Sequence, residues 1–122
     1  MSGLVNVLAV AAGGAIGAVA RYGVGLAVVA AWPQAGWLGT LSVNVAGTFA
    51  LAWLLAGWAD APDAARLFFA TGVLGAFTTY ATFTVEGLRL VQAGRLGTAA
   101  AYVAMTLILA AFAAVAGWRL GS

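Results

Sequence analysis

"GVLGAFTTYATF", residues 72–83, stands out in a chain that otherwise consists mostly of alanine, valine, leucine and glycine. The stretch holds two glycines, three threonines and three aromatic residues. Gly72 and Gly75 lower helix propensity, and threonine side chains can bond backbone groups in non-helical conformations. We therefore predict that a helix breaks within this stretch. Such a break is tolerated inside a membrane only where its backbone is buried in protein or lines a cavity.

The composition around this stretch indicates an integral membrane protein. Of the 122 residues, 65% are hydrophobic and 7% are charged, whereas a soluble domain has about a quarter charged residues. A bilayer span needs roughly 20 mostly apolar residues. We predict an all-α fold, a single four-helix transmembrane domain over residues 1–122. Its helices are expected at about 4–30, 38–58, 64–90 and 96–120, with the third helix broken mid-membrane.

Several classes of function are disfavoured by what the sequence holds. The N-terminal apolar run lacks a basic start and continues past any cleavage site, so we expect a retained helix rather than a signal peptide. Cysteine and histidine are absent, which removes thiol chemistry and the usual general base and metal ligand. The net charge of +2 comes with five scattered arginines, so no nucleic-acid partner is expected. We do not expect an enzyme.

The small residues and the aromatic residues at predicted helix ends suggest how the helices pack. Gly13, Gly14, Gly17 and Ala18 form a small-residue face that permits close helix contact, either as packing alone or as an oligomer interface. We take either use to favour an oligomer, most simply a two-fold dimer. Tryptophans near predicted ends are expected at the headgroup level: Trp32, Trp37, Trp58 and Trp118.

The arginines are balanced between the two sides of the predicted membrane domain. Arg66 and Arg119 fall on one side, and Arg89 and Arg95 fall on the other. The sequence therefore carries no positive-inside bias. Such a chain could insert both ways and form an antiparallel, dual-topology homodimer. Arg21 lies within the first helix, and its side is left open.

Two polar stripes run along predicted helices. Thr40, Asn44 and Thr48 share one face of the second helix, because they are spaced by four residues. The fourth helix carries Thr98, Tyr102 and Thr106 at the same spacing. Hydrogen bonding between helices and lining of a pathway are both consistent with these stripes.

The aromatic residues beyond the break add a second polar feature. Tyr80 and Phe83 lie three residues apart, so their ring edges, which carry partial positive charge, can face an anion. Core packing is the alternative. From the residues alone the prediction is a small channel or transporter with a broken third helix.

Three stretches occur together in this order: "GGAIGAVARY" (residues 13–22), "GTLSVNVAGTF" (39–49) and "GVLGAFTTYATFTVE" (72–86). They resemble the motifs of the Fluc family of bacterial fluoride-specific ion channels. The resemblance implies passive export of fluoride through the bacterial inner membrane by an antiparallel homodimer with two pathways. It also implies a central structural sodium ion (Na+), which matches onto the backbone carbonyls of Gly75 and Thr78.

The resemblance further assigns roles to polar and aromatic side chains. Five residues match the fluoride pathway: Asn44, Tyr80, Phe83, Tyr102 and Thr106. The sequence departs from the family at Tyr80, where phenylalanine is usual, and at Ala81 and Ala110, where a hydroxyl is usual. Arg21 and Glu86 match family positions at the end of the first helix and after the break, where we expect them to anchor helix ends.

The competing interpretation is a small dual-topology exporter of multiple drugs or of cations. Proton-coupled export needs a carboxylate near the middle of a membrane helix. The only acidic residues are Asp60, Asp63 and Glu86, all near predicted helix ends, so this interpretation is disfavoured.

Overall fold

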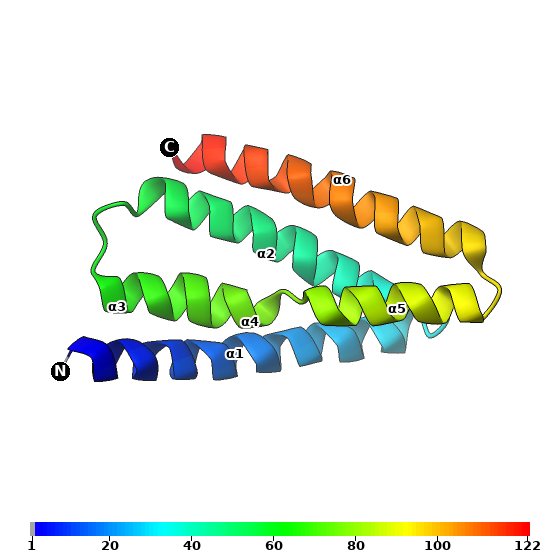
Figure 1. The fold of residues 1–122 in the computed structure, drawn as a ribbon, viewed down its shortest axis with the longest axis horizontal. Helices are drawn as coiled ribbons and strands as arrows, with labels where there is room; N and C mark the ends of the chain where they lie inside the picture. Colours follow the sequence, from blue (N-terminus) through cyan, green and yellow to red (C-terminus); the bar gives the residue numbers. More distant parts are fainter. Residues whose placement is uncertain (1) are drawn as a thin grey trace.

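Four helical spans lie side by side in the computed structural model, which describes residues 2–122 (Figure 1). All four are long and apolar enough to cross a membrane, so the predicted all-α fold with four spans is confirmed. Their ends lie within two residues of the expected positions. The elements in chain order are α1 (Ser2–Ala31), α2 (Trp37–Gly57), the third span made of α3 (Asp63–Arg66), η1 (Leu67–Leu74), α4 (Gly75–Phe77) and α5 (Tyr80–Gln92), and finally α6 (Leu96–Gly121).

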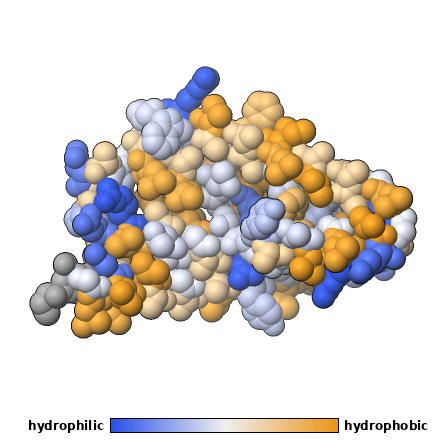
Figure 2. Space-filling view, in the orientation of Figure 1, coloured by the Kyte–Doolittle hydropathy of each residue, from blue (hydrophilic) through white to orange (hydrophobic). Residues whose placement is uncertain are grey.

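The surface of the chain is mostly apolar along the spans. Figure 2 shows hydrophobic residues over most of the visible face, with hydrophilic residues gathered mainly toward the two ends. Large side chains that a soluble protein would bury are exposed, among them Val19 at 70% and Phe112 at 70%. Because such patches mark membrane or protein contact, these faces are suited to lipid.

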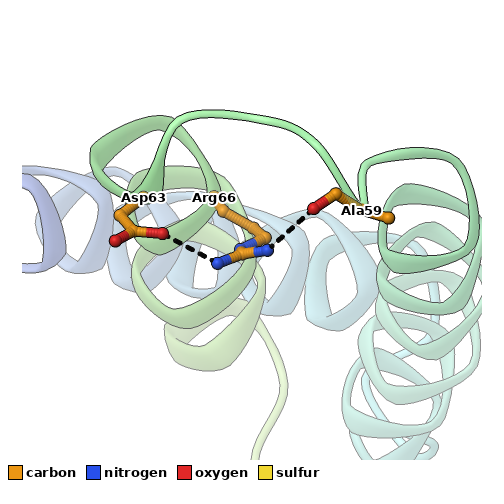
Figure 3. Close-up of polar contacts among 3 residues, drawn as sticks. All are labelled: Ala59, Asp63 and Arg66. Atoms are coloured by element: carbon orange, nitrogen blue, oxygen red, sulfur yellow. Dashed lines mark hydrogen bonds and ion pairs between the residues drawn. The ribbon is translucent and has the colours of Figure 1, made fainter.

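Polar contacts close the loop between the second and third spans. Arg66 donates to the Asp63 carboxylate at 2.9 Å and to the Ala59 carbonyl at 3.4 Å (Figure 3). This ion pair is exposed, so its contribution to stability is about 1 kcal/mol or less. It marks one end of the bundle, where both chain termini also lie (Figure 1).

The third span is broken at two threonines rather than at its glycines. Thr78 and Thr79 have extended backbone, with φ/ψ of −89/156° and −152/122°. Gly72 lies inside the π-helix η1 and Gly75 is helical, with φ/ψ of −62/−39°. The prediction of a break within residues 72–83 is correct, and so is the part assigned to the threonines; the part assigned to Gly72 and Gly75 is wrong. A single glycine lowers helix propensity by only about 1 kcal/mol, and tertiary packing overrides it here.

The small-residue face of α1 packs against the third span of the same chain. A Cβ atom at Gly13 would lie 3.1 Å from the Cα of Gly72, and one at Gly17 would lie 3.0 Å from the Phe77 nitrogen. A Cβ at Gly14 would meet nothing within 4 Å. Gly13 and Gly17 therefore serve packing within one chain, which is one of the two uses that the sequence left open, and Gly14 makes no such contact.

A second glycine seam joins α2 and α6. A Cβ at Gly117 would lie 3.2 Å from the Trp53 nitrogen, and one at Gly57 would lie 3.0 Å from the Gly121 carbonyl oxygen. Glycines four residues apart let helix backbones approach closely in a membrane. The two seams, Gly13/Gly17 and Gly117/Gly121, bring the helices close enough for the polar contacts described next.

We expect Gly17→Ala to destabilise the protein by about 1–3 kcal/mol, because the new methyl group collides with the backbone of η1 and α4. The matched control is Gly14→Ala, which adds the same group to open space and should leave stability unchanged or slightly higher. The free energy of unfolding in detergent measures both. Equal stability of the two variants would contradict the close α1 contact.

Candidate functional site

The Asn44 side chain of α2 holds the broken segment through two hydrogen bonds to Thr79. The Asn44 amide group donates to the Thr79 carbonyl at 3.0 Å, and the Thr79 N–H donates to the Asn44 side-chain oxygen at 2.8 Å. The Thr48 hydroxyl donates to the Asn44 backbone carbonyl at 2.6 Å. Asn44 thus satisfies the Thr79 N–H, which the break frees, and adds a hydrogen bond to the Thr79 carbonyl. Since the amide carries two N–H groups, one of them is left over for another acceptor.

Thr79 also begins the helix that follows the break. Its hydroxyl oxygen accepts from the Thr82 N–H at 3.3 Å, which is the standard N-cap arrangement for threonine. Sequence reasoning gave Thr79 no role of its own. The signal was present, because threonine directly before a helical segment is a typical N-cap.

The break frees two backbone carbonyls that the sequence analysis assigned to sodium. The helical partner of the Gly75 carbonyl would be the Thr79 N–H, which donates to Asn44 instead. The helical partner of the Thr78 carbonyl would be the Thr82 N–H, which donates to the Thr79 hydroxyl. Both carbonyls are therefore available to a hard cation, which prefers oxygen ligands.

Arg21 anchors the helix end before the break. Its Nε donates to the Ala76 carbonyl at 3.0 Å, a favourable place for a cation because the C-terminal end of a helix carries partial negative charge. The expected anchoring role is therefore seen, but at the end of α4. Arg21 itself lies within the first helix, as the predicted bounds of 4–30 imply, since α1 continues to Ala31.

Four of the five predicted pathway residues line one groove of about 280 Å³ beside the break. Phe83 is 9% exposed and Tyr80 is 80% exposed, and their ring centroids lie 6.1 Å apart. Ala110 also lines this groove. The position at which this chain lacks the hydroxyl usual in the family therefore lies among the polar side chains of the groove. We call this cavity the polar groove; its lining residues are Asn44, Thr48, Thr78, Thr79, Tyr80, Phe83, Thr106, Leu107 and Ala110.

The fifth predicted pathway residue, Tyr102, is packed directly behind the groove. It is fully buried, and its ring lies 5.2 Å from that of Phe83 and 5.4 Å from that of Trp37. Within the described part of the chain, three buried side-chain polar atoms have no hydrogen-bond partner: Trp37 Nε1, Tyr102 Oη and Thr106 Oγ1. Trp37, expected at the headgroup level, is the first residue of α2, and its indole N–H is buried against the cluster that contains Tyr102.

A larger cavity, which we call the vestibule, also borders Thr79. It has a volume of about 500 Å³ and is lined by Arg21, Thr40, Thr79 and Glu86 among others. The Thr40 hydroxyl donates to the Glu86 carboxylate. Thr79 lines both the vestibule and the polar groove, so both cavities border the break.

Glu86 does not anchor a helix end as expected. It lies in the middle of α5 and is tied to α2 through Thr40. Sequence reasoning placed Thr40 and Glu86 separately and missed their contact. The spacing of Thr40 on the same α2 stripe as Asn44 was the available signal.

The fold and this site define a multi-pass membrane protein with a helix broken beside two polar cavities, the architecture of a channel or transporter. The sequence model of the family described as "CrcB-like protein, Camphor Resistance (CrcB)" matches residues 8–118. The chain belongs to this family. A relative called "Fluoride-specific ion channel FluC" from Rhodospirillum centenum is 46% identical, with 93% of each chain covered.

Further relatives carry the same name. That from Agrobacterium fabrum is 42% identical over 97% of each chain, and that from Hyphomonas neptunium is 46% identical over 84% of each chain. The resemblance inferred from the three motifs is thus confirmed. These names are those of ion channels, which are not a class of enzyme.

We expect Asn44→Leu to speed hydrogen exchange of the Thr79 N–H about tenfold, because the N–H loses its acceptor. Asn44→Asp keeps an acceptor for that N–H and should change its exchange less. Ser42→Ala serves as the control, since the Ser42 hydroxyl is exposed and bonds only the Leu38 carbonyl of its own helix. Mass spectrometry of the peptide that contains Thr79 measures the rates. The same rate in all three variants would show that Asn44 does not hold the break.

Proposed function

We propose that this protein is a fluoride-specific ion channel that lets fluoride leave the bacterial cytoplasm by passive flow across the inner membrane. One observation carries the proposal: the Thr106 hydroxyl, a buried donor without a hydrogen-bond partner among the described residues, lines the polar groove at the break. The names of the relatives support fluoride as the ion. On this proposal the protein is not an enzyme.

The chemistry of the groove suits a small anion. Fluoride is strongly hydrated, and its transfer out of water is costly unless hydrogen-bond donors replace the lost water. Asn44 offers its remaining amide N–H, and Tyr102 and Thr106 offer hydroxyl groups. The ring edges of Tyr80 and Phe83 add weak positive charge. None of these groups is a cation, which matters because conduction requires that the ion leave again.

A second copy of the chain would complete each pathway. Tyr80 lines the polar groove yet is 80% exposed, so one chain alone leaves this side of the groove open. The arginines are balanced between the two ends of the bundle: Arg66 and Arg119 near the termini, Arg89 and Arg95 at the other end. We therefore propose an antiparallel, dual-topology homodimer, in which the two copies of the groove form two pathways.

The free carbonyls of Gly75 and Thr78 are the proposed ligands of a structural sodium ion. Two carbonyls from one chain are few for a hard cation. The antiparallel partner would supply the same two, and together they would place oxygen atoms around one central ion. Bound there, the ion would supply a fixed positive charge and link the two broken helices.

Fluoride efflux from liposomes tests the proposed function. Tyr80→Phe should conserve the rate, because the ring edge is kept. Phe83→Ile should lower it about tenfold, equivalent to about 1.4 kcal/mol in the barrier, because it removes the edge that faces the groove. Chloride efflux should be far slower than fluoride efflux for every variant. No fluoride efflux from the native dimer, or proton-coupled export of an organic cation, would overturn the proposal.

Replacing Gly75 tests the sodium-linked dimer. A Cβ at Gly75 meets only the Ala70 carbonyl of its own chain, at the ordinary distance of 3.6 Å, so Gly75→Val should fold. We expect it to lose the dimer on size exclusion, because the side chain crowds the partner. Thr78→Val keeps the carbonyl and should remain a dimer that dissociates when N-methyl-D-glucamine replaces sodium. A native dimer indifferent to sodium would contradict the assignment of Gly75 and Thr78.

A further inference from the structure

Trp37 is the one tryptophan whose indole N–H is buried without a hydrogen-bond partner within residues 3–122. It is the first residue of α2, and its ring packs against the buried cluster that contains Phe83 and Tyr102. Indole is a hydrogen-bond donor only. A buried donor that lacks an acceptor is costly, so this N–H requires an acceptor from outside the chain's own side chains and backbone.

The ring of Trp37 ends a continuous file of aromatic rings that starts at the break. The ring centroids of Tyr80 and Phe83 lie 6.1 Å apart, those of Phe83 and Tyr102 lie 5.2 Å apart, and those of Tyr102 and Trp37 lie 5.4 Å apart. The file joins α5, α6 and α2. It leads from the polar groove toward the end of the bundle where α2 begins (Figure 1).

Trp37 also extends the polar stripe of α2. It lies seven residues before Asn44, so the two share a face and are separated by about 10 Å along the helix. Trp37 Nε1, Tyr102 Oη and Thr106 Oγ1 are all buried without a partner in the described chain. Tyr102 and Thr106 are no more than 5% exposed. Three unpartnered donors thus lie on α2 and α6, two helices that pack against each other.

We propose that Trp37 is a further residue of the anion pathway, and that its indole N–H donates to the dehydrated anion at the end of the aromatic file nearest the start of α2. This inference rests on the proposed function. The donor would favour fluoride over chloride, because fluoride is the smaller anion and the stronger hydrogen-bond acceptor. In this role Trp37 completes a row of donors that includes Thr106 and Tyr102.

Indole N–H signals give a direct test that does not depend on flux. The full-length protein is labelled with 15N-tryptophan in detergent micelles, and the Trp37 signal is assigned by its loss in Trp37→Phe. Fluoride should shift the Trp37 signal, and chloride at equal ionic strength should not. The signals of Trp32 and Trp53, which are 59% and 51% exposed, should stay in place. If fluoride leaves the Trp37 indole N–H shift unchanged, the N–H does not donate to the anion, and an ordered water is its acceptor. That result would overturn the inference.

Fluoride efflux gives the second test. Trp37→Phe keeps an aromatic ring in the file and removes only the donor, so efflux should fall about tenfold while size exclusion still shows the native assembly. Trp53→Phe is the matched control on the same helix and should leave efflux unchanged. A loss of efflux without a fluoride-dependent signal, or a signal shift with full efflux in Trp37→Phe, would each refute the pathway role.

These outcomes separate the inference from the function on which it rests. If the native protein conducts no fluoride, the proposed function fails. If the native protein conducts fluoride and Trp37→Phe conducts equally well, only the role of Trp37 fails. If Trp37→Phe does not fold, the fluoride titration of the native protein still decides, with the Trp37 signal assigned by substituting the other four tryptophans in turn.

Discussion

The pairing of Asn44 with Thr79 is the interaction on which the rest of the structure depends. An unsatisfied backbone group inside a bilayer costs several kcal/mol, so a helix cannot stop at mid-span unless other groups replace its hydrogen bonds. Asn44 supplies both a donor and an acceptor to the same residue, and Thr79 in turn caps the next helix. Arg21 satisfies a carbonyl on the other side of the break. The break is thereby stable, and two polar cavities border it.

These hydrogen bonds require backbones that lie unusually close, and the glycines provide that. Gly13 and Gly17 let α1 lie against η1 and α4, which brings Arg21 to the Ala76 carbonyl. Gly117 and Gly121 let α6 lie against α2, which places Tyr102 and Thr106 beside the residues of the polar groove. In lipid, where no hydrophobic force drives helices together, such close packing is the main source of association. Packing and site chemistry therefore depend on the same glycines.

The polar groups around the break divide into those that are used within the chain and those that are left free. Thr40, Glu86, Thr48 and Arg21 have partners in the chain. The hydroxyls of Tyr102 and Thr106 and the indole of Trp37 have none among the described residues. A buried hydrogen-bond donor without an acceptor is costly. These unpaired donors are what suits the site to a dehydrated anion. The exposed ring of Tyr80 shows that the groove is open on the side where a second copy would lie.

The sequence by itself determined the four spans and the presence of a break within residues 72–83, and its resemblance to a known family pointed to four of the residues that line the groove. Hydropathy, length and residue spacing are properties of a local stretch, and they suffice for the spans and the break. Only the tertiary structure decided that the break falls at Thr78 and Thr79, that Gly13 and Gly17 serve contacts within the chain, and that Glu86 bonds Thr40. It also packed the partly buried ring of Trp37 against Tyr102. Each of these features depends on which helices lie side by side. A glycine, a carboxylate or an indole N–H takes its role from the group that faces it on the neighbouring helix. The sequence, which orders residues along the chain, does not specify that group.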